Sequence, residues 1–304
     1  MLLNYPMALS TGFSGYDANV GDMRNSGVEF EIKGTPVRFD DFEWNVTFMG
    51  STTKNEVLKL TATTPEIISG TRIIKEGYPI NTFYMAKSAG VDPATGAQLY
   101  WVYDKDENGN PGEPYISSDY SKATNSKYFM GDRIPDLYGS IGTDLTWKGL
   151  SLSVLTTYSI GGKVYDSLYA GSMNNMYFNT NFNAHALRRW QKPGDITDVP
   201  RMEVGGSYAT TDRFLVDASY FAIKNVTLGY TLPAHLTKKA WINKARFYVA
   251  CENFFTFDNL RDLPIDPEVI SGVSMFNNGN YNSGRTGVGT PAMKNVSVGI
   301  QLNF

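Results

Sequence analysis

The sequence has little of what disulfide-stabilised and most catalytic proteins require. Its 304 residues include one cysteine, Cys251, so no disulfide can form within the chain. There are two histidines, His185 and His235, and neither has a cysteine or another histidine at metal-ligand spacing. No serine lies in a G-x-S-x-G turn, and no glycine-rich phosphate-binding loop is present. We therefore expect a protein that is not an enzyme, with no catalytic, cofactor or metal residues.

Long apolar runs and an excess of one charge are also missing. Lys and Arg number 27 against 30 Asp and Glu, so there is no basic surface for nucleic acid. No stretch approaches the ~18 consecutive apolar residues of a membrane-spanning helix. The first residues lack the positive segment and apolar core of a secretory signal, and we expect that the beginning of a longer protein is missing.

What the sequence does contain is strict alternation of apolar and polar residues, the pattern of β-strands. Long alternating runs predict strands at 42–51, 137–147, 150–160, 220–232, 245–257 and 294–304, and shorter strands at 27–34, 80–88 and 98–103. The long runs exceed the ~5–6 residues of typical soluble strands. Rings stand near several strand ends, as in the aromatic girdles of membrane barrels: Trp44, Trp147, Tyr158, Tyr230 and Phe257.

The connections between these strands alternate in length. Lys148-Gly149 is a tight hairpin, 161–218 is a long irregular stretch, 233–243 is a compact link with one helical turn, and 258–290 is again long. Antiparallel up-and-down barrels of outer membranes have short periplasmic turns and long extracellular loops. The sequence predicts an all-β chain from such a barrel, with apolar side chains facing lipid and polar ones facing the lumen.

Five segments resemble one known family. They are NVGDMRNSGVEFEI (19–32), SYFAIKNVTLGYTLP (219–233), RFYVACENFFTF (246–257), DPE (266–268) and the terminal NVSVGIQLNF (295–304). In sequence and order they are similar to the C-terminal half of SusC/RagA-type TonB-linked outer-membrane transporters. The resemblance implies that residues 1–304 form one partial barrel domain, the C-terminal portion of a large transmembrane β-barrel, without the plug domain.

The resemblance also implies a function. Such transporters import glycans, or in some members peptides, through a plugged barrel of about 22 strands. They lie in the outer membrane of Gram-negative, Bacteroidetes-like cells, with a SusD-like lipoprotein over the extracellular opening. Contact with TonB would occur only through the missing N-terminal part. Phe304, at the end of the last alternating strand, matches the signal read by the outer-membrane assembly machinery.

Loop aromatics are the candidate substrate-binding residues. Flat rings suit the apolar faces of sugars, and the candidates are Trp101, Tyr103 and Trp190, with Tyr100, Tyr177 and Phe178 beside them. The alternative is that these rings pack loops against one another or against a partner protein. Ring counts do not distinguish a glycan from a peptide substrate.

Two further alternatives stay open at this point. The segment DKDENGN (104–110) imitates the start of a calcium loop, but Tyr115 replaces the chelating glutamate at the twelfth position, which favours a solvated turn. The alternative to a transporter is a soluble all-β carbohydrate-binding module, in which the apolar strand faces would be buried against a second sheet.

Overall fold

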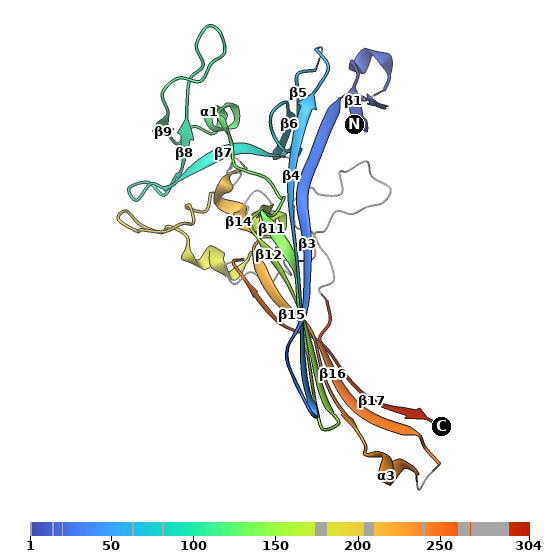
Figure 1. Ribbon diagram of the computed structural model, residues 1–304. Coiled ribbons are helices and arrows are strands. Elements are labelled where there is room, and N and C mark those ends of the chain that lie inside the picture. The colour runs from blue at the N-terminus through green and yellow to red at the C-terminus, as the bar shows by residue number, and fades with distance from the viewer. Residues whose placement is uncertain are drawn as a thin grey trace.

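A computed structural model describes residues 2–13, 15–19, 21–62, 64–80, 82–173, 181–203, 210–238, 241–260, 268 and 292–304. The main sheet has seven antiparallel strands in the order β17-β16-β15-β12-β11-β4-β3. Their bounds are β3 Asp22–Phe39, β4 Phe42–Lys59, β11 Leu137–Trp147, β12 Leu150–Ile160, β15 Tyr220–Thr231, β16 Lys244–Asp258 and β17 Asn295–Asn303. In Figure 1 this sheet is a long twisted wall. Within it, every strand pairs with its neighbours along the chain.

Short and long connections lie at opposite ends of the sheet, as the sequence predicted. Lys148 (φ 45°) and Gly149 (φ 90°) join β11 to β12 with two positive φ angles, which is the conformation of a type I′ turn. The link from β15 to β16 contains the short helix α3, Ala234–Thr237, and lies at the same end of the sheet as this hairpin (Figure 1). None of the described helices has the length and hydrophobicity to cross a membrane.

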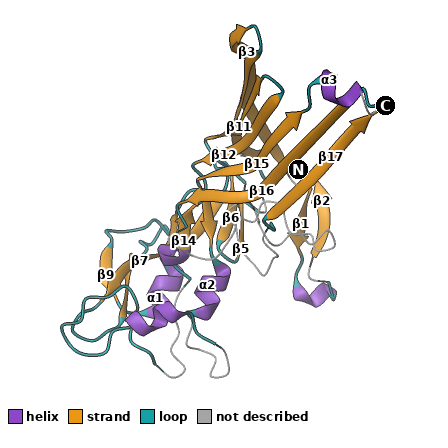
Figure 2. Ribbon diagram, turned by 90° about the horizontal axis from the view of Figure 1, so that it is seen from below, coloured by secondary structure: helices purple, strands orange, loops and turns teal. Residues whose placement is uncertain are grey.

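Two insertions at the other end of the sheet form the part of the molecule that we call the head (residues 60–136 and 161–219), which packs against the end of β4. The first contains β5 Glu66–Ser69, β6 Arg72–Lys75, β7 Thr82–Val91, β8 Gln98–Val102, β9 Tyr115–Ser117, α1 Tyr120–Asn125 and β10 Lys127–Phe129. The second contains β13 Lys163–Tyr165, α2 Ser167–Ser172, η2 Ala184–Arg188, η3 Asp212–Phe214 and β14 Leu215–Asp217. A hairpin of β1 (Leu2–Pro6) and β2 (Gly15–Asn19), with η1 (Leu9–Thr11) between them, precedes β3. Figure 2 shows α1 and α2 together in the head, far from α3.

Among the described residues, the largest buried apolar cluster lies in the head, and both insertions contribute to it. Phe83 and Met85 of β7 pack with Tyr165, Phe214 and Leu215 of the second insertion. The expectation of an irregular loop over 161–218 was therefore wrong: this segment carries short helices and strands that fold against the first insertion. Its elements are too short to leave a periodic pattern in the sequence.

The two faces of the main sheet differ in chemistry along its whole width. One cross-strand row on the first face is apolar from edge to edge: Val37, Trp44, Leu145, Leu152, Leu228, Val249 and Val298. A neighbouring row on the opposite face is mostly polar: Asn45, Asp144, Ser153, Thr227, Ala250 and Ser297. We call these the apolar face and the polar face.

Aromatic rings form two rows on the apolar face. Near the short turns the row is Phe39, Phe42, Trp147, Leu150, Tyr230 and Phe247; near the head it is Phe30, Gly50, Gly139, Tyr158, Phe221 and Phe257. Along β15 the two rows are nine residues apart, about 30 Å along the strand, or roughly 23 Å across a membrane at a ~40° tilt. That spacing matches the ~25 Å apolar band of outer-membrane barrels.

The glycines in the second row make room for its rings. A Cβ on Gly50 would lie 2.4 Å from the Phe30 ring, and one on Gly139 would lie 2.0 Å from the Met49 carbonyl oxygen and 2.8 Å from the Tyr158 hydroxyl. Of the five rings predicted to mark girdles, Trp44 is the exception, because it lies one row inside the first. Its indole nitrogen donates to Thr143 Oγ1 at 2.8 Å, so the polar edge of this inner ring is satisfied without water.

The apolar face is exposed in the described structure. The exposed fractions are 53% for Leu228, 56% for Phe255 and 77% for Val298. A soluble sandwich would bury these side chains against a second sheet. The described residues place no such layer there, and a continuous apolar surface of this size fits hydrocarbon rather than water.

The position of Val226 allows a direct test of this arrangement. Val226 lies on the apolar face, two rows from each aromatic row, and Thr227 lies beside it on the polar face. In a closed barrel that contains this chain, Val226→Arg is expected to make folding into lipid vesicles less favourable by about 2–4 kcal/mol, as for a cation at the bilayer midplane. Thr227→Arg is the matched control and should cost less. Urea titration of the vesicle-inserted protein measures both, and equal penalties would contradict the assignment of faces.

Candidate functional site

The polar face carries an ion pair at an irregularity of β15. Strand registers shift between Ile223 and Asn225 on both sides of this strand, so Lys224 is an extra residue without a cross-strand partner. Its ammonium group pairs with the carboxylate of Glu268 and lies 3.4 Å from Asn253 Oδ1. The second carboxylate oxygen of Glu268 accepts a hydrogen bond from Thr157 Oγ1 at 3.1 Å.

This ion pair fixes one point of the connection between β16 and β17 to the wall. The Lys224 and Glu268 side chains are only 27% and 21% exposed. Partial burial strengthens the attraction between them and makes loss of either partner costly, because the remaining charge keeps its desolvation penalty. Glu268 is the last residue of the DPE motif; Asp266 and Pro267 lie outside the described residues.

The first two aromatic candidates lie on the β-structure of the first insertion. Lys87 Nζ lies 6.0 Å from the centroid of the Trp101 ring, a cation–π distance, and Trp101 is partly exposed. The Tyr103 hydroxyl donates to the Lys127 carbonyl at 2.9 Å. Burial is the main cause that raises the pKa of Tyr103 to about 12. Tyr100, the residue before Trp101, is 1% exposed and packs in the core, so its ring is not available to a ligand.

Trp190 lies on the second insertion and joins the two insertions. Its indole nitrogen donates to the Pro93 carbonyl at 2.9 Å, and its ring covers Gly96, where a Cβ would come within 2.4 Å of it. These contacts pack one loop against another; Trp190 is also partly exposed, and its role in substrate binding stays a prediction. Trp101 and Tyr103 keep partly exposed rings, and their role in substrate binding stays a prediction. Tyr177 and Phe178 lie outside the described residues.

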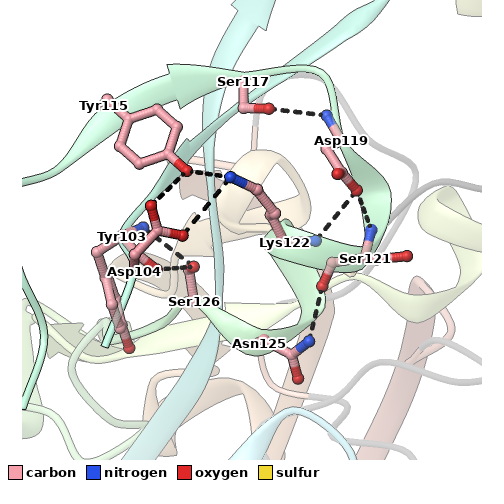
Figure 3. A network of polar contacts seen from close by, with 9 residues as sticks. All are labelled: Tyr103, Asp104, Tyr115, Ser117, Asp119, Ser121, Lys122, Asn125 and Ser126. Carbon is pink, nitrogen blue, oxygen red and sulfur yellow. Dashed lines mark hydrogen bonds and ion pairs between the residues drawn. The ribbon is translucent and has the colours of Figure 1, made fainter. Parts of the chain in front are cut away.

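The calcium-like segment is occupied by its own contacts (Figure 3). The Tyr115 hydroxyl donates to Asp104 Oδ2 at 3.0 Å and accepts from Lys122 Nζ at 2.5 Å, while Lys122 Nζ lies 3.6 Å from Asp104 Oδ1. These contacts, with the Tyr115 hydrogen bond first, raise the pKa of Lys122. The ammonium group of Lys122 thus lies beside Asp104, where a calcium loop would place the metal cation.

Asp106, the next acidic residue of this segment, caps its own turn. Its carboxylate accepts from the backbone nitrogens of Asn108 and Asn110 at 2.9 and 2.8 Å, and bonds to Asn110 lower its pKa. Asp104 and Asp106 therefore have separate partners, the arrangement of a solvated turn. Among the described residues, no group of three or more His, Cys, Asp or Glu side chains could hold a metal ion.

Phe304 follows the last strand directly. β17 pairs with β16 from Glu252↔Asn295 to Lys244↔Asn303, and Phe304 continues the apolar alternation with its side chain 76% exposed. β17 and β3 are the two edges of the main sheet. Strand, register and exposure agree with the predicted last strand, while the role of Phe304 in assembly stays a prediction.

Sequence reasoning missed a cavity in the head. It has a volume of about 250 Å³ and is lined by three arginines, Arg189, Arg201 and Arg213. They come from three separate short segments of the second insertion, so no sequence motif predicts that they lie together. The one available signal is the density of arginine in a stretch that otherwise reads as polar loop.

The Lys224–Glu268 pair generates a prediction about stability. Glu268→Gln removes the carboxylate charge and leaves a partly buried ammonium group, so we expect a loss of about 1–3 kcal/mol in the free energy of unfolding. Glu56→Gln is the control, because Glu56 pairs with the more exposed Arg24 at 2.8 Å and should cost about 0–1 kcal/mol. Urea unfolding in detergent measures both. A loss no larger than that of the control would mean that the pair does not hold the connection to the wall.

The proteins to which this chain is similar in sequence are TonB-dependent receptors. No model of a known protein family matches the chain. The whole chain is 27% identical to the TonB-dependent receptor P3 of Formosa agariphila and covers 31% of it. The TonB-dependent receptor SusC of Bacteroides thetaiotaomicron is 26% identical over 84% of the chain, which covers 25% of SusC.

Solved structures give the same result. The structure of the RagAB peptide transporter matches with a TM-score of 0.82 and 29% identity, over 100% of this chain and 32% of that one. The RagAB peptide importer in its open-open state matches with a TM-score of 0.74 and 28% identity, over 100% of this chain and 31% of that one. The shared length is a smaller portion than the half that the motifs suggested. The chain is thus, along its whole length, a relative of the SusC/RagA-type TonB-dependent receptors, about a third of whose length it spans.

Proposed function

We propose that residues 1–304 form part of the barrel wall of an outer-membrane TonB-dependent nutrient importer. The single observation that carries this proposal is the two-faced sheet of seven long antiparallel strands, apolar and exposed on one face and polar on the other. Its apolar face would contact lipid, its polar face would line the lumen, and the head would lie on the extracellular side, where barrels of this type carry their long loops.

The proposal extends to partners. The relatives are named TonB-dependent receptors, so energy would come through TonB, contacted by parts of the importer other than this wall. The RagAB structures are those of a peptide transporter, and SusC gives its name to the type. A SusD-like lipoprotein over the head is the surface partner that we expect, with a glycan as the first choice of substrate and a peptide as the second.

A non-enzymatic role is part of the proposal. His185 Nδ1 lies 3.1 Å from the Tyr169 hydroxyl in the head, and His235 lies on α3 at the far end of the sheet. The two histidines are thus in different parts of the molecule. The relatives are receptors and transporters by name, which points in the same direction.

The sole cysteine tests the lipid-facing assignment. Cys251 pairs with Val226 and Val296 on the apolar face, and Ala250 is its neighbour on the polar face. In vesicles, native Cys251 should react with a lipid-soluble maleimide and resist a charged, membrane-impermeant one. The matched variant is Cys251→Ala combined with Ala250→Cys, which should show the opposite preference. Identical labelling of the two proteins by both reagents would overturn the proposed wall.

The transport role is tested in the organism. Deletion of the encoding gene should abolish growth on one oligomeric nutrient and leave growth on its monomer unchanged, because monomers pass through general porins. Growth curves on defined glycans and on peptides measure this and also separate the two substrate classes. If the deletion strain grows as well as the parent strain on every oligomer tested, the chain is not part of an importer of these nutrients.

A further inference from the structure

The link between β15 and β16, at the short-turn end of the sheet, carries charge and exposed apolar side chains that the wall does not require. We call residues 233–244 the basic link, because they include three lysines and no acidic residue in a chain whose net charge is −3. Within it, Leu236 is 50% exposed and Trp241 is 91% exposed. A bare tryptophan beside exposed cations is typical of segments that lie at a membrane surface.

Backbone hydrogen bonds hold the basic link against the last strand. Asn243 N donates to Asn303 O at 2.8 Å, and Ile242 N donates to Thr237 O at 3.2 Å. Trp241 has a φ of 59°, a left-handed conformation that is unfavourable for a bulky residue. Because its ring is exposed, contacts within the described chain do little to offset this strain. A contact of the ring outside the chain would offset it.

The basic link covers the end of the apolar face. Ala245 is in phase with Phe247 along β16, so its side chain points to the apolar face. Other side chains at this end of the face are exposed, Phe247 and Leu302 among them, whereas Ala245 is buried. α3 packs against β16, and Thr237 of α3 is buried as well. The basic link therefore continues the apolar face.

The depth of this contact matches the head-group layer of a bilayer. Ala245 lies two residues beyond Phe247, which belongs to the aromatic row near the short turns. Two residues span about 7 Å along a strand, or about 5 Å across a membrane at a ~40° tilt. The polar layer on each side of the hydrocarbon core is ~5–7 Å thick. In Figure 1 and Figure 2, α3 lies at this end of β16, so the basic link stands at the level of lipid head groups.

The lysine of the link that can reach a lipid is Lys238. It caps the C-terminal end of α3, is exposed, and forms no ion pair with any described residue. Lys244 differs, because it is in phase with Arg246 and so points to the polar face. Acidic groups at this end of the sheet, which include the aspartates of the β3–β4 turn (40–41) and the terminal carboxylate of Phe304, do not pair with Lys238.

We propose that the basic link binds an anionic phospholipid of the periplasmic leaflet, with the Trp241 ring in the head-group layer and the Lys238 ammonium group beside the lipid phosphate. A tryptophan ring and a lysine with its apolar stem both suit this layer, and each lysine near an anionic surface strengthens binding to it. The proposal rests on the proposed wall, because the link reaches a bilayer only if the apolar face contacts lipid. A periplasmic protein that covers the link in place of lipid is an outcome that would overturn it.

The test places a fluorescent reporter on α3 in a closed barrel that contains this chain. Leu236→Cys, combined with Cys251→Ala, is labelled with bimane and reconstituted into vesicles of phosphatidylcholine and phosphatidylglycerol. Each lipid in turn is replaced by a form brominated near the head-group end of its acyl chains, which quenches the dye on contact. We expect brominated phosphatidylglycerol to quench at a mole fraction about fivefold lower than brominated phosphatidylcholine, with the difference falling as salt rises. Equal quenching by the two lipids, or quenching by neither, would overturn the proposal.

Variants assign the contact to single side chains. Lys238→Gln should lower the preference for phosphatidylglycerol about fivefold, to near none. Lys244→Gln is the matched control, because it removes the same charge from the polar-face side of the link, and it should change the preference less than about twofold. Trp241→Ala should weaken quenching by both lipids, whereas Trp241→Tyr should retain it. Equal effects of the two lysine variants would contradict the role of Lys238.

A reporter on the wall separates this proposal from the proposed function. Native Cys251 in the same barrel is labelled with bimane and measured in the same vesicles. If the lipids quench the dye at Cys251 but not the dye on the Leu236→Cys variant, the wall stands and the proposal for the basic link is wrong. If they quench neither, the proposed wall itself is wrong.

Discussion

The pairing of backbone groups between strands is the constraint on which this molecule depends. In hydrocarbon an unpaired N–H or C=O costs several kcal/mol, so a sheet in a membrane must pair every strand on both sides. Continuous pairing across seven strands also fixes the direction of every side chain, because a slip of one residue would exchange the two faces. The apolar row that runs from Val37 to Val298 is the visible result of that register.

At a β-bulge the alternation of side chains along a strand shifts by one residue, and this shift keeps the apolar side chains of β15 on the same face of the sheet. On β15 the outward residues are Tyr230, Leu228 and Val226, and beyond the extra residue Lys224 they become Ile223 and Phe221. An extra residue shifts the alternation by one and leaves its own side chain outside the ladder. Lys224 is thus free to reach Glu268, so the irregularity that preserves the apolar face also provides the anchor for the connection after β16.

Interruptions of the alternating pattern also explain which strand bounds could be predicted from the sequence. The bounds of β11 and β12 were predicted correctly because the two-residue turn Lys148-Gly149 marks where they meet and no proline lies in either strand. β3 was predicted only over 27–34, although it spans Asp22–Phe39, because its register shifts between Gly34 and Val37 and Pro36 lies between them. Proline is tolerated there since β3 is an edge strand.

The head could not be predicted because its contacts join distant segments. Ser88 N and Asp212 Oδ1, for example, are partners 124 residues apart in sequence. Residue type alone identified the aromatic candidates, but it could not separate the buried Tyr100 from the partly exposed Trp101 and Trp190. The three arginines of the cavity belong to different short elements, so only the folded head brings them together.

The edges of the main sheet connect the proposed wall to the size of its relatives. In the described structure β3 and β17 each have one side without a strand partner, which lipid does not tolerate on an exposed edge. The wall therefore needs further strands on both sides to close. Barrels of this class have about 22 strands, so seven are about a third. The chain covers 32% of the RagAB chain that it matches, so about two thirds of that protein lies outside the matched region and has room for further strands.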